Sequence, residues 1–180
     1  SAFNNGGFSL FPNSLMNFSG QYLITFTISM LYIIGGTGFV VLMDIKRSKR
    51  WKGLSTNSKL ILSTIAGLNL IAFVLLWAIE SNNPLTLAPM SLGDQALNAW
   101  FHATVPRSSG FNSLDLAQMK DASTLVTMLL MFIGGGSMST AGGIKVGTFI
   151  IVLLSVISFL RREDEIRVFN HSVSQKTSFK

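Results

Sequence analysis

Two long stretches of the chain contain hydrophobic and small polar residues but no charged side chain. They run from Tyr22 to Met43 and from Leu60 to Ile79. A helix that rises about 1.5 Å per residue needs about 20 residues to cross roughly 30 Å of hydrocarbon, and both stretches reach that length. Core helices of a large soluble protein are the alternative, but such helices are seldom apolar all round over this length. The pattern therefore predicts two membrane-spanning helices.

The loop between these stretches is strongly basic. Residues 44–59 contain six Lys and Arg side chains against the single acid Asp44. Such an excess marks the cytoplasmic side of a membrane protein. Nucleic-acid binding is the other explanation for a basic cluster, but no recognition module or interleaved aromatic pattern accompanies it, so we expect no nucleic-acid partner. The following loop, residues 80–120, lacks this excess and is expected on the outer side.

Composition agrees with a membrane protein and argues against an enzyme. The chain has 180 residues, of which 48% are hydrophobic and 12% charged, whereas a soluble domain is about one quarter charged. It has no Cys, and its two histidines, His102 and His171, lie far apart. No metal cluster, nucleophile–base set or pair of membrane carboxylates is visible, so we expect no enzymatic activity and no cofactor. No secretory signal is visible and the chain begins with Ser1, so we expect an internal fragment.

A landmark occurs twice, about one hundred residues apart. Gly7-Phe8 and Gly110-Phe111 each follow small polar residues, and each precedes a Ser-Leu pair. About 25 residues after each comes a glycine cluster within an apolar run, at 35–38 and at 134–136. Two landmarks in the same order and at similar spacing argue for an internal duplication.

A short helix precedes the second Gly-Phe pair. Ser91 is a capping residue with Asp94 three positions on, a pattern that starts a helix, and Pro106 forces the residue before it into extended geometry. The helix is about 13 residues or roughly 20 Å long, too short to span a bilayer. A short helix followed by an extended glycine-containing stretch is typical of a re-entrant pore loop. In such a loop, backbone carbonyls near Gly7 and Gly110 would replace the hydration shell of a cation.

The second glycine cluster interrupts an apolar helix. Five glycines fall within residues 134–143, and each costs about 1 kcal/mol relative to Ala in a helix interior. We expect a discontinuous membrane helix with an unwound centre, a feature of transport pathways. A phosphate-binding loop is rejected because Ile144 separates Gly143 from Lys145 and no strand precedes it. Lys145 either lines the pore, tethers this loop, or extends to an interface.

Three other polar positions carry weaker expectations. His102 is expected to be a hydrogen-bonded packing residue of the short helix. Arg107 either shields the outer mouth, is solvated, or anchors the pore loop through carbonyl groups, which is the favoured alternative. Asn69 lies near the small-residue pair Ser63 and Gly67, a pattern typical of a helix-packing face.

Three motifs together resemble the Trk/Ktr/HKT family of potassium transporters, and most closely the membrane subunits of bacterial Ktr systems. They are SAFNNGGFS at residues 1–9, TVPRSSGFNSLD at 104–115 and MFIGGGSMSTAGGIK at 131–145. Members of that family arrange four helix–pore loop–helix repeats around one pore. The resemblance implies an all-α integral membrane fold with a broken inner helix, of which this chain is a fragment.

The resemblance also implies roles for individual residues. The ion filter would comprise Asn5, Gly6, Gly7, Ser108, Ser109 and Gly110. The intramembrane gating loop beneath it would comprise Gly134, Gly135, Gly136, Ser137, Ser139, Thr140, Gly142, Gly143 and Lys145. The implied boundaries are 1–43 for the end of one repeat, 44–59 for the cytoplasmic loop, 60–160 for a complete repeat and 161–180 for a cytoplasmic tail.

The implied function is passive potassium uptake by a multi-pass protein of the plasma membrane, here a bacterial inner membrane. A homodimer and a cytoplasmic nucleotide-binding regulatory subunit of the KtrA type are the implied partners. Two alternatives stay open: a sodium or mixed-cation transporter, and a potassium-binding subunit of an ATP-driven complex.

Overall fold

The computed structural model describes residues 1–107, 110–160, 165–168 and 171–174 and is dominated by helices. The predicted all-α class is confirmed. In addition to the helices, two short strands pair as an antiparallel hairpin in which Glu165 faces Ser174. The elements are η1 (Met16–Phe18), α1 (Tyr22–Thr37), α2 (Phe39–Arg47), η2 (Trp51–Gly53), α3 (Thr56–Glu80), α4 (Leu92–Thr104), η3 (Leu116–Gln118), α5 (Asp121–Phe132), α6 (Val146–Leu160), β1 (Glu165–Val168) and β2 (His171–Ser174).

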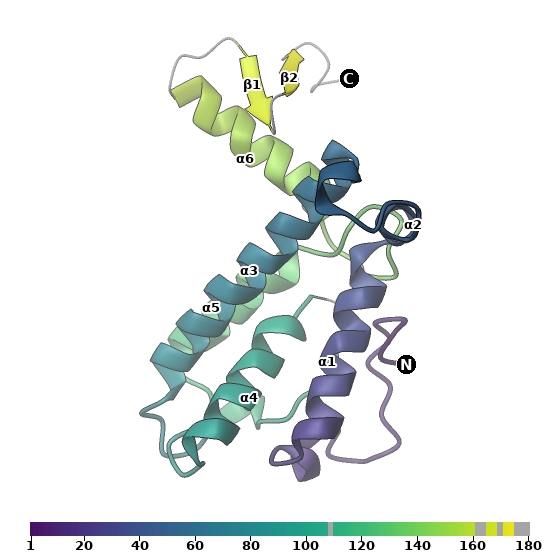
Figure 1. Ribbon diagram of the computed structural model, residues 1–180. Helices are drawn as coiled ribbons and strands as arrows, with labels where there is room; N and C mark the ends of the chain where they lie inside the picture. The colour runs from purple at the N-terminus through teal and green to yellow at the C-terminus, as the bar shows by residue number, and fades with distance from the viewer. Residues whose placement is uncertain (108–109, 161–164, 169–170, 175–180) are drawn as a thin grey trace.

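Helix α3 contains the second predicted span and is one straight element (Figure 1). It begins where the Ser55 side chain caps it by accepting from the Ser58 N–H at 3.2 Å. Its 25 residues are long and apolar enough to cross a membrane. Within the described ranges, it is the one unbroken helix that meets both criteria, and α1 with α2 meets them only as a bent pair.

The first predicted span is not a single helix. The chain turns by 94° between α1 and α2, at Gly38, which has a φ of +97°. Only glycine adopts this backbone conformation readily, and a Cβ at Gly38 would lie 2.3 Å from the carbonyl oxygen of Ser137. The expectation of one continuous crossing over 22–43 is therefore wrong, because hydropathy does not register the backbone angle that a single glycine permits.

The predicted short helix is α4. Its 13 residues begin after Ser91, whose side chain accepts from the Asp94 N–H as expected. The expectation for the residue before Pro106 is wrong: Val105 has helical backbone, with φ of −65° and ψ of −41°, because its N–H continues the last turn by donating to the Phe101 carbonyl. Helix α4 packs against α3 and α1, and α5 packs against α3. Figure 1 shows α4 running only part of the way along α3, starting from the end of α3 that is remote from α2. Tyr32 of α1 and Phe101 of α4 form the buried contact between those helices, together with Phe111 beyond the loop.

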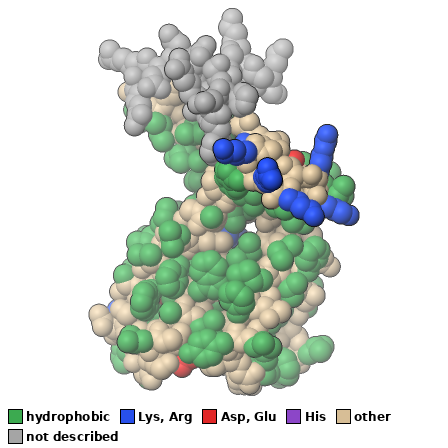
Figure 2. Space-filling model, in the orientation of Figure 1, with side chains coloured by type: hydrophobic (Ala, Val, Ile, Leu, Met, Phe, Trp, Pro, Cys, Tyr) green, Lys and Arg blue, Asp and Glu red, His purple; other side chains and the backbone are tan. Residues whose placement is uncertain are grey.

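The outward surfaces of the helices are apolar. On the face in Figure 2, hydrophobic side chains cover most of the helical body, whereas Lys and Arg gather around α2 and the loop that follows it. Exposed apolar residues occur on every long helix, for example Leu23 on α1, Leu70 on α3 and Leu129 on α5. Soluble monomers rarely expose large apolar residues on all of their long helices together, because contiguous apolar patches favour association or membrane contact.

Candidate functional site

The two Gly-Phe loops lie against each other, although about one hundred residues separate them in the sequence. Gly7 and Gly110 both have left-handed backbone, with φ of 66° and 71°. A Cβ atom at Gly110 would lie only 3.1 Å from the Cα atom of Gly7. The segments beyond the loops are also joined, because the Leu15 N–H donates to the Asn112 carbonyl at 3.0 Å. The repeated landmarks therefore converge on one place.

The remaining residues predicted for the ion filter have different environments. Asn5 is buried and also has left-handed backbone, with a φ of 51°, and its amide donates to Thr140 Oγ1 at 3.1 Å. Gly6 is exposed beside the ring of Phe8. Ser108 and Ser109 lie outside the described residues.

Helix α4 supports the loop from its buried face. The Nε2 atom of His102 accepts from the Leu114 N–H at 3.2 Å, so the expectation of a hydrogen-bonded packing residue is confirmed. Asn98, one turn earlier, accepts from Ser113 Oγ at 2.7 Å and donates to the Ser19 carbonyl at 2.9 Å. We did not predict a role for Asn98, although its spacing of four from His102 places both on one helix face.

The glycine-rich segment between α5 and α6 folds back on itself, as expected for a broken helix. The Gly134 N–H donates to the Ile144 carbonyl at 2.9 Å, and the Val146 N–H donates to the Gly135 carbonyl at 2.9 Å. A Cβ at Gly134 would lie 1.7 Å from the carbonyl oxygen of Gly142, so the crossing requires glycine. Lys145 Nζ donates to the Ala141 carbonyl at 2.7 Å, which agrees with the tethering alternative.

This glycine-rich segment, residues 134–145, is seated on the bend between α1 and α2. The Gly136 N–H donates to the Gly36 carbonyl at 2.7 Å, and the Phe39 N–H donates to the Met138 carbonyl at 3.2 Å. A Cβ at Gly136 would lie 2.1 Å from the carbonyl oxygen of Thr37. The glycine clusters of the two repeats are therefore in direct backbone contact, which the sequence analysis did not predict.

Thr140 connects this segment to the first Gly-Phe loop. Its hydroxyl accepts from the Asn5 amide and lies 3.3 Å from the carbonyl oxygens of both Phe3 and Gly35. A Cβ at Gly35 would lie 1.8 Å from the Phe3 carbonyl oxygen, so the loop lies directly on α1. Of the other predicted gate residues, Ser137 contacts Gly38, whereas Ser139 Oγ is buried and has no hydrogen-bond partner within the described residues.

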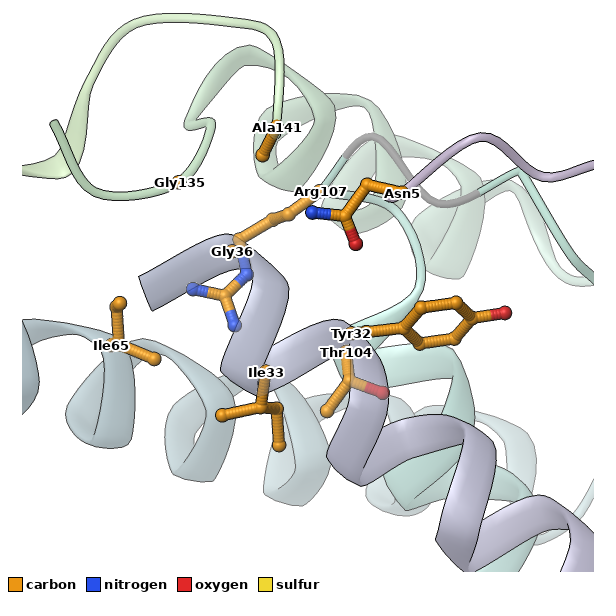
Figure 3. Close-up of a pocket in the computed structure, with 9 residues that line it drawn as sticks. All are labelled: Asn5, Tyr32, Ile33, Gly36, Ile65, Thr104, Arg107, Gly135 and Ala141. Carbon is orange, nitrogen blue, oxygen red and sulfur yellow. The ribbon is translucent and has the colours of Figure 1, made fainter. Parts of the chain in front are cut away.

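A cavity lies between the Gly-Phe loops and the glycine-rich segment (Figure 3). Its empty volume is about 290 Å³, part of which is open to solvent. Side chains and backbone from both repeats line it, namely Asn5, Tyr32, Ile33, Gly36, Ile65, Thr104, Arg107, Gly135 and Ala141. The cavity is therefore lined by residues of both features that the sequence analysis interpreted as filter and gate, which also touch each other through Asn5 and Thr140.

Arg107 is buried in the wall of this cavity. It is 8% exposed, and its Nη2 atom donates to Asn69 Oδ1 on α3. The alternative of a solvated arginine is therefore wrong, whereas the shield at the outer mouth stays a prediction. The prediction that Arg107 anchors the pore loop agrees with this hydrogen bond. Within the described residues, however, Arg107 is bonded to the Asn69 side chain rather than to backbone carbonyls. Asn69 consequently holds the loop, in addition to lying on a helix-packing face.

The described residues offer carbonyl groups rather than a side-chain metal site. No group of three or more His, Asp or Glu that could hold a metal ion occurs among them. Gly7 and Gly110 are adjacent and both have left-handed backbone, and backbone carbonyl oxygens are the ligands that replace the hydration shell of K⁺ in a selectivity filter. Among the described lining residues, the ionisable side chains are those of Tyr32 and Arg107.

Comparison with known proteins gives consistent matches over nearly the whole chain. The family model described as "TrkH: Cation transport protein" matches residues 1–80 and 59–178. Ktr system potassium uptake protein B of Bacillus subtilis is 44% identical over 173 residues, which cover 96% of this chain and 39% of the relative. The potassium/sodium uptake protein NtpJ of Enterococcus hirae is 36% identical over 175 residues, covering 97% and 39%.

The fold also matches a solved structure. The crystal structure of the potassium transporter TrkH from Vibrio parahaemolyticus superposes with a TM-score of 0.77 at 22% identity, covering 98% of this chain and 38% of that one. The chain thus spans about two fifths of the length of each of these three proteins. Because the family model covers nearly all of it, the chain belongs to the TrkH family of cation transport proteins.

Proposed function

We propose that this chain forms part of a pore for potassium uptake across the plasma membrane of a bacterium. The observation that carries the proposal is the contact between Gly7 and Gly110, two left-handed glycines from separate repeats. Each would turn backbone carbonyls of its loop toward the ion path. Asn5, Gly6, Ser108 and Ser109 would complete these two quarters of the filter, and the remaining quarters would come from outside this chain.

The apolar outer surface supports a multi-pass location in the membrane. Helix α3 is long enough to span the bilayer, and α1 crosses most of it before the bend. The basic residues between α2 and α3 then lie on the cytoplasmic side. In this orientation the Gly-Phe loops are on the outer side of the cavity, and the glycine-rich segment is on its cytoplasmic side.

The glycine-rich segment, residues 134–145, is proposed to be the gate. Most of its residues are glycine or have small side chains, it borders the cavity together with the filter loops, and hydrogen bonds hold it to its surroundings at Gly36, Phe39 and Asn5. Hydrogen bonds of this kind contribute about 0.5–1.5 kcal/mol each. A regulatory subunit could therefore displace the segment without unfolding the helices on either side.

Two points of the function rest on the relatives alone. The names of the Ktr proteins describe a transport system, which supports a partner subunit; that the partner is a cytoplasmic nucleotide-binding subunit and that the transporter is a homodimer are parts of our proposal. The relative from Enterococcus hirae is named a potassium/sodium uptake protein, which favours mixed-cation transport as the second candidate. Competition between K⁺ and Na⁺ in a flux assay separates the two.

The proposal is tested by Gly110→Ala in the full-length protein, expressed in a bacterium that lacks potassium uptake. Alanine in left-handed backbone costs about 1–2 kcal/mol, and its Cβ would press on Gly7. We expect growth at low external K⁺ to be lost and the preference for K⁺ over Na⁺ to fall. The matched control is Gly67→Ala on α3, where a Cβ would meet nothing within 4 Å. Unchanged selectivity in Gly110→Ala would remove this loop from the filter.

A further inference from the structure

Helix α2 and the turn after it form a surface that the ion path does not use. Its first part is apolar and exposed, with Phe39 62%, Val40 42% and Met43 50% accessible. Its last part is cationic, and the cations continue into the turn η2, where Trp51 is also exposed. We call this the α2 surface; its basic members are Lys46, Arg47, Lys49, Arg50 and Lys52.

The apolar and cationic residues share one side of the helix. At about 100° per residue, positions 39, 43, 46 and 47 fall on the same face, and all four are exposed. Val41 lies opposite and is fully buried in the cluster that contains Ile61 of α3. The outward face of α2 therefore changes along its length, from apolar near the bend to positively charged at the end.

The one acid of this region offsets only part of the charge, because a single carboxylate faces five Lys and Arg side chains, although it does interact with Arg47. Asp44 is held toward the start of α3, because its carboxylate accepts from the Ser55 N–H at 2.8 Å. Lys59, from the same basic loop, donates to the Lys52 carbonyl at 3.2 Å and so ties α3 to the turn. The cations thus extend from a structured turn, and Figure 2 shows them gathered around α2.

The bend fixes how this surface meets the membrane. Since α2 is turned 94° from α1, a crossing α1 leaves α2 nearly parallel to the bilayer plane. Its nine residues extend about 14 Å, which is too short for a span. A helix lying in the interface places apolar side chains at the acyl boundary and cations at the level of the phosphates.

We propose that the α2 surface binds the headgroups of anionic phospholipids in the cytoplasmic leaflet. The charge of the surface is complementary to these lipids, and the exposed apolar residues beside the cations favour a bilayer over a soluble anion. The proposal uses the membrane orientation of the proposed function but is independent of its ion path.

The test measures which lipid lies beside α2. The chain has no cysteine, so Met43→Cys in a cysteine-free version of the full-length protein takes one bimane fluorophore. The labelled protein is placed in bilayers that contain brominated phosphatidylglycerol or brominated phosphatidylcholine, which quench on contact. We expect half-maximal quenching by brominated phosphatidylglycerol at a mole fraction on the order of fivefold lower than by brominated phosphatidylcholine. Such a ratio corresponds to about 1 kcal/mol, the contribution of one cation near an anionic surface.

Variants assign the preference to these cations. Lys46→Gln/Arg47→Gln/Lys49→Gln should abolish the preference, and Lys49→Gln alone should reduce it. The control Lys120→Gln removes an exposed cation just before α5, far from α2, and should leave the preference unchanged. Equal quenching by both lipids would overturn the proposal. Absence of quenching by either lipid would also overturn it, because protein would then cover α2. Quenching by either lipid does not depend on ion flux. A failure of the proposed transport function would therefore appear in flux assays and not in this experiment.

Discussion

Removing the hydroxyl of Thr140 tests whether hydrogen bonds hold the proposed gate shut. Thr140→Val keeps the side-chain shape but removes the acceptor for the Asn5 amide and the donor that faces the Phe3 and Gly35 carbonyls. One hydroxyl carries a single proton, so it donates to one of these carbonyls at a time. The substitution therefore removes two hydrogen bonds from the closed arrangement.

The size of the effect follows from these two bonds. Each contributes about 0.5–1.5 kcal/mol, and the site is partly exposed, which favours the lower half of that range. A total of about 1–2 kcal/mol changes a two-state ratio by a factor of about 5–30. We expect potassium flux without the regulatory subunit to rise by up to this factor, measured in proteoliposomes that contain the full-length protein.

Two variants control for packing and position. Thr140→Ser keeps the hydroxyl and should behave as the parent, whereas Thr148→Val makes the same change at an exposed position on α6 and should have no effect. Asn5→Asp removes the amide donor and tolerates left-handed backbone, so its effect should not add to that of Thr140→Val. Unchanged or reduced flux in Thr140→Val, with a normal Thr140→Ser, would refute the reasoning.

Two further predictions concern stability in detergent. Glu80 is 1% exposed, and its carboxylate accepts from two side chains and one backbone N–H at 2.6–2.8 Å. Glu80→Gln should therefore lower the free energy of unfolding by about 1–3 kcal/mol. The control Asp121→Asn, at the exposed start of α5, should leave the free energy of unfolding unchanged. Gly38→Ala would place a Cβ 2.3 Å from the Ser137 carbonyl oxygen in left-handed backbone. It should lower the thermal midpoint, whereas Gly20→Ala, where a Cβ meets nothing within 4 Å, should not; equal midpoints would contradict a strained bend.

The elements that hydropathy and capping describe could be predicted from the sequence. The apolar run over 60–79 lies within α3, the Ser91 cap starts α4, and the glycines from Gly134 end α5. Each of these signals is local, because a charge-free run, a cap and a helix breaker act within a few residues of the chain. The duplicated Gly-Phe pairs added one long-range prediction, the shared role of two loops, and the contact of Gly7 with Gly110 is consistent with it.

Contacts made by the backbone could not be predicted in the same way. The seating of Gly136 on Gly36 is a hydrogen bond between main-chain atoms, and main-chain atoms leave no pattern of side chains to recognise. The turn at Gly38 could not be predicted either, because it depends on a backbone angle and not on a pattern of side chains. Anchoring by Arg107 was the favoured prediction, but its partner was not predicted, because the charge suggested carbonyl groups whereas the described partner is the Asn69 side chain of another helix.

The close backbone contacts have a mechanical consequence for the protein. The bend that turns α2 into the interface is made at Gly38, which is also the residue on which Ser137 of the glycine-rich segment rests. Movement of either part alone would break the Gly136–Gly36 bond or the Phe39–Met138 bond. Interfaces packed this closely change between discrete arrangements rather than deform continuously. We therefore expect the orientation of α2 and the position of the proposed gate to change together, so that a headgroup bound to the α2 surface would act on the same equilibrium as a hydrogen bond at Thr140.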